Sequence, residues 1–283
     1  MLTPELLSIT KRKDKNAFSV TRKNQTSYVK RRRELSLIFY LGWKENDVRF
    51  ITPSSLRRDF MFKVAIDGPS GAGKSTIAKT VAKKLGFVYI DTGAMYRTAA
   101  LACIDRDVNI KANPEKAIEI VNNISIDIDY IDGEQRIFLD GCDVSDKIRT
   151  PQISMGASDV SAIGAVREKL VSMQRALAGT KNVIMDGRDI ASSVLPDADV
   201  KIFLTASDKE RANRRYKELI QKGEQVSYED VLKDIQKRDT QDTTRAISPL
   251  KQVEDAVLVD TSDLTFDESV KAVLDLINSK REV

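Results

Sequence analysis

The chain has 283 residues, of which 41% are hydrophobic and 31% charged, a composition typical of a globular protein with an ample core. It contains no histidine, which excludes histidine triads, histidine general bases and histidine metal ligands. No apolar run reaches the roughly eighteen residues of a membrane-spanning helix, and Cys103 and Cys142 lack metal-ligand spacing. We therefore expect a cytoplasmic protein with reduced cysteines and no membrane contact.

The net charge of +4 is unevenly distributed along the chain. Residues 1–60 hold 14 Lys and Arg against 6 Asp and Glu, a net charge of +8, whereas residues 61–283 carry −4. We therefore place a boundary at residue 60 and interpret residues 1–60 as a basic, poorly ordered appendage. Met61 lies where the following domain would begin without it. A transit peptide, or an arm that contacts nucleic acid or a membrane surface, is the less favoured alternative.

An apolar run at residues 62–66 is followed by Gly-Pro-Ser-Gly-Ala-Gly-Lys-Ser-Thr at residues 68–76. A strand, a loop of the form G-x-x-x-x-G-K-S and a helix together predict a phosphate-binding loop. Glycines let backbone N–H groups surround the anion, and the helix that follows presents its positive end. We expect Lys74 to reach the β- and γ-phosphates and Ser75 to ligate Mg²⁺. The expected nucleotide-binding residues are Gly68, Gly71, Ala72, Gly73, Lys74, Ser75 and Thr76.

Short apolar strands alternate with helical spacing along the rest of the chain. Further strands are expected at residues 87–90, 182–185, 200–204 and 257–260, and helices at 93–106, 157–178 and 228–242, with a closing helix through Val270 and Ile277. This alternation predicts an α/β fold with a five-stranded, parallel, doubly wound sheet. Alternating isoleucines before Asp132-Gly133 predict a small antiparallel hairpin inserted between residues 122 and 142.

Phosphoryl transfer brings two anions together, so arginines are expected to converge on the phosphate loop. Arg97 and Arg188 each follow a predicted strand end beside the loop. A phosphate monoester is already ionised at neutral pH because its second pKa lies near 6, so such an acceptor suits a chain without histidine. An alcohol acceptor stays open, with Asp91, Asp186 or Asp189 as the base.

Several motifs in residues 61–283 resemble the bacterial cytidylate kinase family, in the order that the family has them. They are the stretches 68–76, 91–97 (Asp-Thr-Gly-Ala-Met-Tyr-Arg), 186–189 (Asp-Gly-Arg-Asp), 211–215 (Arg-Ala-Asn-Arg-Arg) and 238–245 (Arg-Asp-Thr-Gln-Asp-Thr-Thr-Arg). The resemblance implies a P-loop kinase domain with a nucleoside-monophosphate-binding insertion at about 110–160 and a helical lid at about 207–222. It also implies transfer of the ATP γ-phosphoryl group to CMP or dCMP with Mg²⁺, by a protein that we expect to be a monomer.

The same resemblance implies a role for each matching residue. Arg97, Arg188 and Arg245 would hold the CMP phosphate, and Ser158, Arg167 and Asp189 would contact the cytosine. Thr92, Tyr96, Arg238 and Asp242 would line the ribose and acceptor pocket, Arg214 would close onto ATP, and Asp186 would position Mg²⁺ through water. Lys74, Arg188 and Arg214 are thus the expected catalytic residues. Aspartate can accept from the exocyclic amine of cytosine while arginine donates to its O2 and N3.

Two alternatives compete with this interpretation. The first is a small-molecule kinase of the shikimate type, whose acceptor is an alcohol. The second is a nucleotide-binding regulator that uses the basic residues 1–60, although the chain lacks the Asn-Lys-x-Asp motif of guanine-binding switches.

Overall fold

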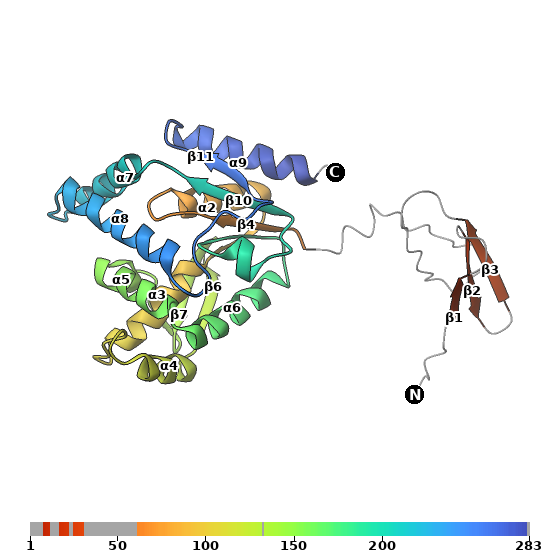
Figure 1. Ribbon diagram of the computed structural model, residues 1–283, viewed down its shortest axis with the longest axis horizontal. Coiled ribbons are helices and arrows are strands. Elements are labelled where there is room, and N and C mark those ends of the chain that lie inside the picture. Colours follow the sequence, from red (N-terminus) through yellow and green to blue (C-terminus); the bar gives the residue numbers. More distant parts are fainter. Residues whose placement is uncertain (1–7, 12–16, 23–24, 31–60, 132, 282–283) are drawn as a thin grey trace. The chain divides into compact units, whose positions relative to one another are not determined.

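The computed structural model describes residues 8–11, 17–22, 25–30, 61–131 and 133–281. The chain divides into two compact units, residues 1–60 and 61–283 (Figure 1). In the first unit, β1 (Ser8–Lys11), β2 (Ala17–Arg22) and β3 (Gln25–Lys30) form an antiparallel sheet in the order β1-β2-β3. The other residues of 1–60, which we expected to form a poorly ordered appendage, lie outside the described residues. Asp132 of the expected hairpin turn also lies outside them.

The second unit is built on a five-stranded sheet whose strand pairs are all parallel, which confirms the predicted α/β fold. Its strands are β4 (Lys63–Asp67), β5 (Val88–Asp91), β9 (Val183–Gly187), β10 (Val200–Thr205) and β11 (Val257–Asp260), in the order β11-β10-β4-β9-β5. From β4 the chain crosses to the edge strand β5 and returns to β9, and it then continues on the other side of β4 with β10 and β11. Such a reversal of strand order leaves a crevice at the carboxyl ends of the strands.

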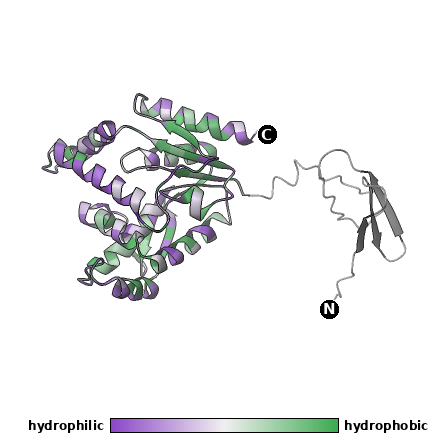
Figure 2. Cartoon of the chain, viewed as in Figure 1, coloured by the Kyte–Doolittle hydropathy of each residue, from purple (hydrophilic) through white to green (hydrophobic). Residues whose placement is uncertain are grey.

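Both faces of the central strands β4 and β9 are buried, because alternate residues of each strand pack in opposite directions, whereas the edge strand β11 leaves Val257 and Leu258 exposed. Val64 and Ile66 pack on one face with α2 (Lys74–Leu85) and α9 (Phe266–Arg281). Ala65 and Met185 pack on the other with α6 (Gly164–Ala178) and the π-helical turn η3 (Ile190–Val194), and α3 (Thr92–Ile104) lies beyond them. Figure 2 shows the hydrophobic residues gathered on the strands of this sheet.

Between α3 and α6 the chain forms the insertion, which contains the predicted hairpin. Its elements are α4 (Pro114–Asn123), β6 (Ile126–Ile131), β7 (Glu134–Leu139), β8 (Cys142–Asp143), η2 (Lys147–Arg149) and α5 (Pro151–Ser161). Strands β6 and β7 pair antiparallel, with Ile131 opposite Glu134 across the two-residue turn. The hairpin lies beside β5, where the Tyr130 hydroxyl donates to the carbonyl of Tyr89 at 2.7 Å.

One predicted helix was wrong. The expected continuous helix at residues 157–178 is divided into α5 and α6, because Ile163 takes an extended conformation (φ −89°, ψ 114°) and starts a new helix. The apolar spacing continues across the break, so the pattern alone did not reveal it. Helix α4 was not predicted from the sequence.

Helices α7 (Asp208–Gln221) and α8 (Tyr228–Thr244) form a pair with its own small core of Ala212, Leu219, Val231 and Ile235. Their remaining surface is hydrophilic, as Figure 2 shows. Helix α7 coincides with the expected lid. In the described part of the chain, no helix combines the length and the apolar character that a membrane span requires.

Candidate active site

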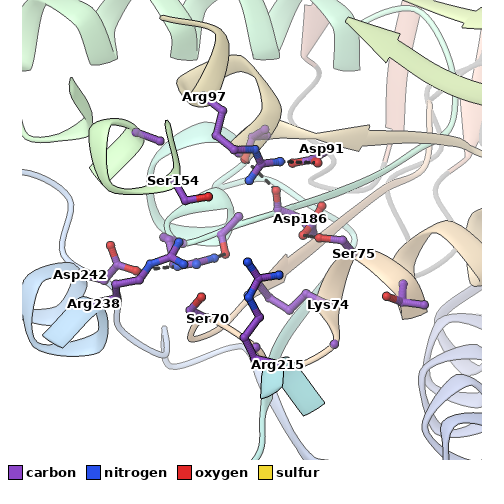
Figure 3. A pocket seen from close by; sticks show the side chains of 18 of the residues that line it. Ser70, Lys74, Ser75, Asp91, Arg97, Ser154, Asp186, Arg215, Arg238 and Asp242 are labelled. Atoms are coloured by element: carbon purple, nitrogen blue, oxygen red, sulfur yellow. Dashed lines mark hydrogen bonds and ion pairs between the residues drawn. The ribbon is translucent and has the colours of Figure 1, made fainter. Parts of the chain in front are cut away.

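The carboxyl ends of β4, β5 and β9 open into a cavity of about 810 Å³ that residues of α5, α7 and α8 also line. Figure 3 shows part of its lining. A cavity of this size holds small ligands of several hundred Å³. Of the residues expected at the site, all except Gly68 and Ala72 line the cavity: Gly71, Gly73, Lys74, Ser75, Thr76, Thr92, Tyr96, Arg97, Ser158, Arg167, Asp186, Arg188, Asp189, Arg214, Arg238, Asp242 and Arg245.

The glycine loop between β4 and α2 places the first turn of α2 at the cavity wall. Gly71 (φ 75°) and Gly73 (φ 85°) both adopt the left-handed conformation that favours glycine. Gly73 caps α2, so the helix directs its positive end and its free N–H groups into the cavity. This arrangement suits an anion such as a phosphate.

Gly68 and Ala72 have a different environment. A Cβ atom added to Gly68 would lie 1.9 Å from the carbonyl oxygen of Leu204 on β10, so this position requires glycine for the packing of the loop against the sheet. Ala72 is completely buried, and its carbonyl accepts a 3.5 Å hydrogen bond from Arg214. Both residues therefore support the loop from outside the cavity.

Lys74 is buried at the base of the loop, where its Nζ donates to the carbonyl of Pro69 at 2.7 Å. Burial lowers the pKa of Lys74 to about 7, and the nearby positive charge of Arg188 acts in the same direction. The carboxylates of Asp186, Asp242 and Asp67 raise this pKa and so offset part of the effect. A phosphate beside Nζ would favour the charged form, because an opposite charge compensates the loss of water. The lysine is thus positioned to bind an anion.

Ser75 and Asp186 offer adjacent oxygen atoms on the sheet side of the cavity. Ser75 Oγ donates to Asp186 Oδ2 at 2.9 Å, and the Tyr89 hydroxyl donates to Oδ1 at 2.8 Å. Burial raises the pKa of Asp186, and the neighbouring Asp91 adds to the effect. A bound cation would relieve this cost. The described residues contain no cluster of three or more acidic, cysteine or histidine ligands.

Arginines from separate elements face the centre of the cavity. Arg188, directly after β9, donates through Nε to Asp242 Oδ2 at 2.7 Å. Arg97, on α3, pairs with Asp91 at 2.8 Å. Burial, together with the nearby Arg188, lowers the pKa of Arg238 to about 10. Figure 3 shows Arg97, Arg215 and Arg238 around the same space as Lys74. This surplus of guanidiniums fits a multiply charged anion.

A second charged group lies under α5 and α6. Arg167 forms an ion pair with Asp189 in which both side chains are buried, and Arg245 reaches Asp189 Oδ1 at 3.5 Å. The Arg167 guanidinium lies 5.6 Å from the centre of the Tyr96 ring. The Tyr96 hydroxyl is buried without a hydrogen-bond partner in the described part of the chain, and burial raises its pKa to about 12.

The side chains of Thr92 and Arg214 form hydrogen bonds with other groups of the protein. The Thr92 hydroxyl donates to the carbonyl of Asp186 at 2.7 Å. On α7, Arg214 pairs with Glu210 at 2.9 Å and donates to the carbonyl of Thr261 at 2.7 Å. A Cβ atom at Gly73 would lie 3.7 Å from Arg214 Nη1, so this guanidinium already borders the glycine loop.

Sequence reasoning missed part of the cavity wall. The unexpected residues are Ser70, Ile77, Gly93, Arg149, Ser154, Ala157, Ser161, Gly187, Glu210, Arg215, Glu218, Lys222, Leu264, Phe266 and Ser269. Arg215 belongs to a motif that was recognised, whereas Arg149 had no local signal. Asp67, which does not line the cavity, was not expected to be buried either: its carboxylate accepts from the backbone N–H groups of Ile190 and Ala191, both at 2.8 Å, and burial raises its pKa to about 6.

Such a cavity favours the transfer of a phosphoryl group between two anionic ligands, one at the glycine loop and one under α5, with arginines between them. The fold and the site are those of a P-loop kinase.

Comparison with known proteins agrees and is more specific. The family model described as cytidylate kinase matches residues 64–279. A cytidylate kinase of Caldicellulosiruptor saccharolyticus is 54% identical over 75% of this chain and 94% of its own length, and one of Lactobacillus johnsonii is 48% identical over 79% of this chain and 97% of its own. The chain belongs to the cytidylate kinase family.

Among solved structures, a shikimate kinase from Acinetobacter baumannii in complex with shikimate is 18% identical over 80% of this chain and 98% of its own length, with a TM-score of 0.39. A likeness this remote does not bear on the substrate.

Proposed function

We propose that the protein transfers the γ-phosphoryl group of ATP to CMP or dCMP, which gives CDP or dCDP and ADP. The observation that carries this proposal is the buried pair of Arg167 and Asp189, which lies in the same cavity as the glycine loop. Membership of the cytidylate kinase family supports it independently.

The charges of the cavity account for the chemistry. An oxygen of the acceptor phosphate attacks the γ-phosphorus, and the bond from that phosphorus to the oxygen of the departing ADP breaks. Lys74 neutralises the donor phosphates, while Arg188 and Arg214 stabilise the charge that spreads over the transferred group. The acceptor oxygen needs no base, because it is already ionised at neutral pH.

The acceptor base is assigned to the buried ion pair. Asp189 accepts from the exocyclic amine of cytosine, and Arg167 donates to its O2 and N3. Ser158 lines the same part of the cavity. Uracil carries an oxygen where cytosine has its amine, so the Asp189 carboxylate would face a second acceptor and reject it.

The remaining acceptor contacts follow from their positions in the wall. Arg97, Arg188 and Arg245 hold the phosphate. Thr92, Tyr96, Arg238 and Asp242 line the ribose and acceptor pocket. Each of these residues borders the cavity.

Mg²⁺ would be held by Ser75 and, through water, by Asp186. Bound there with the nucleotide, the ion would neutralise charge on the donor phosphates. The 2.9 Å hydrogen bond between the two side chains shows that their oxygens face the same space.

We assign the activity to residues 61–283 alone. The insertion at about 110–160 holds the acceptor, and the lid at about 207–222 closes onto ATP and excludes water. We further propose that the protein acts as a monomer in the cytoplasm, in pyrimidine nucleotide metabolism. Contact of residues 1–60 with nucleic acid is the less favoured proposal.

A coupled assay with ATP across AMP, GMP, UMP, CMP and dCMP tests the proposal. We expect the highest kcat/KM with CMP or dCMP, and a higher value for any other acceptor refutes the specificity.

The alternative of an alcohol acceptor is disfavoured by the carboxylates. Asp91 is paired with Arg97, Asp186 accepts from Ser75, and Asp189 is paired with Arg167. Burial would raise the pKa of Asp91, but Arg97 and Arg149 outweigh it and lower that pKa, which makes Asp91 a poor proton acceptor. The carboxylates of Asp186 and Asp189 are already engaged by Ser75 and Arg167.

A further inference from the structure

Arg149 lines the active-site cavity but belongs to none of the recognised motifs. It is the last residue of η2, in the insertion, and its backbone is held on both sides. Ile148 before it is completely buried, and the Thr150 hydroxyl after it caps α5 by accepting from the N–H of Ile153 at 3.3 Å. The Arg149 side chain itself is 52% exposed. Its position is therefore fixed while its guanidinium stays accessible from the cavity.

Arg149 pairs with the carboxylate of Asp91, which also pairs with Arg97. Asp91 Oδ1 caps α3 by accepting from the N–H of Ala94 at 2.9 Å. Asp91 Oδ2 accepts from Arg149 Nη2 at 3.0 Å and from Arg97 Nη2 at 2.8 Å. One carboxylate oxygen thus serves two guanidiniums, one from the insertion and one from the helix that follows β5.

This cluster of Asp91, Arg97 and Arg149 carries two positive charges and one negative charge. Arg97 Nε is buried and has no hydrogen-bond partner within the described residues. Gly93 keeps the group compact, because a Cβ atom there would lie 3.2 Å from both Arg97 Nη1 and Asp91 Oδ1. The cluster therefore has donors and charge left over for a second anion.

We propose that Arg149 is a binding residue for the phosphate of the acceptor, alongside Arg97. In the structure, Asp91 is the anion that both guanidiniums contact. The phosphate dianion of a bound nucleoside monophosphate would accept from both guanidiniums in the same way. It would thereby connect the insertion, through Arg149, to the edge of the sheet, through Arg97. This inference rests on the proposed function, because it assigns one more residue to the same acceptor site. The competing role is a purely structural ion pair between the insertion and β5.

The test compares Arg149→Gln with Arg136→Gln, using KM for CMP and the inhibition constant of cytidine against CMP. Cytidine lacks only the phosphate, so it separates phosphate binding from the integrity of the site. Arg136 is a matched control, since it lies in the same insertion and pairs with Asp143 at 2.7 Å but does not line the cavity.

We expect Arg149→Gln to raise KM for CMP about ten-fold or more, the usual scale of a charged hydrogen bond, and to leave the cytidine constant within about two-fold. Arg136→Gln should change neither value beyond about two-fold. Arg149→Lys keeps the charge without the planar fork and should give a smaller rise.

Equal losses for CMP and cytidine, or no loss for CMP, would overturn the proposal in favour of the structural role. If Arg149→Gln does not fold, the change in KM for CMP relative to the change in the cytidine inhibition constant is measured on Arg149→Lys, and this ratio decides between phosphate binding and the structural role. A failure of the proposed function is visible separately, as wild-type protein that does not phosphorylate CMP. The comparison is then made with the acceptor that it does phosphorylate and the dephosphorylated form of that acceptor.

Discussion

Arg167 and Asp189 form an ion pair with both side chains almost entirely removed from water, although one lies on α6 and the other follows β9. A buried pair gains little net stability, because the loss of hydration offsets the attraction between the charges. The pair also lines the cavity. Its charges are therefore better explained by ligand recognition than by stability.

Asp189→Asn should reverse part of the base preference. The amide can donate to O4 of uracil but offers its single oxygen less favourably to the amine of cytosine. We expect kcat/KM for CMP to fall by about 100-fold and the ratio of UMP to CMP activity to rise, on the scale of discrimination at polar sites. Steady-state kinetics with both acceptors measure it. An unchanged ratio would remove Asp189 from base recognition, and the exposed Asp146→Asn serves as the control.

Lys74→Met should stabilise the free protein. The pKa of Lys74 lies near 7, below its ordinary value of 10.5, because burial disfavours the charge. Below about pH 7 both the folded and the unfolded states carry the proton, so the folded state bears the full cost of the buried charge. Between pH 7 and 10.5 the unfolded state binds more protons, and the cost declines. Thermal unfolding should show a higher Tm for the variant at about pH 6, with a gap that narrows toward about pH 10.

The same pKa predicts how nucleotide affinity depends on pH. Phosphate binding needs protonated Lys74, so the affinity of wild-type protein for ATP should be greatest below about pH 7. It should fall by up to about ten-fold per pH unit above that value, until the pKa of the bound state is reached. Isothermal titration measures this, and Lys74→Met should bind weakly with a flat profile. An equally steep profile in the variant would assign the titration to another group.

Gly68→Ala should act on stability more than on nucleotide contact. The new Cβ atom would meet the Leu204 carbonyl oxygen at 1.9 Å, so β10 or the loop has to move. We expect the free energy of unfolding to fall by about 2 kcal/mol or more. Chemical denaturation is the measurement, and Gly179→Ala is the control, because its nearest neighbour atom would be 3.4 Å away. A variant of normal stability with weak ATP binding would contradict the packing role.

Asp186→Asn should weaken the response to Mg²⁺. The amide keeps one oxygen but loses the charge that makes the site attractive to a cation. We expect a higher Mg²⁺ concentration at half-maximal rate and a kcat lower by about 100-fold, with little change in the affinity for CMP measured without metal. The surface variant Asp197→Asn, which removes an ion pair with Lys63, should leave both unchanged. A normal Mg²⁺ response would exclude Asp186 from the site.

A chain that begins at Met61 should keep its CMP kinase activity. All described residues that line the cavity lie within residues 61–283. We expect kcat and KM within about two-fold of the full chain, as for other changes remote from a site. Loss of activity on truncation would favour the regulator alternative, in which residues 1–60 take part in function.

Much of the fold and of the site could be predicted because the signals are local. The glycine loop is contiguous, and strand, loop and helix follow one another within residues 63–85. Arg97 and Arg188 were expected at the site because each follows a strand, and the carboxyl ends of parallel strands share one edge of the sheet. The hairpin of β6 and β7 was likewise visible as an alternation of period two with a turn.

What escaped prediction depends on contacts between distant residues. The break between α5 and α6 does not disturb the apolar spacing. Position 68 requires glycine because the Leu204 carbonyl leaves no room for a side chain. The buried carboxylate of Asp67 is explained by the N–H groups of Ile190 and Ala191, from which it accepts. Arg149 reaches Asp91 only because the hairpin returns the chain to the end of β5.

From the chain alone one can therefore predict an α/β fold, a glycine loop suited to phosphate, and the residue types expected beside it. Short-range spacing and residue chemistry carry that information. The folded arrangement was needed to learn which charges are paired, which are buried, and that Arg97 and Arg149 share one oxygen of Asp91. Packing of the insertion against the sheet sets those distances, and no local pattern encodes them.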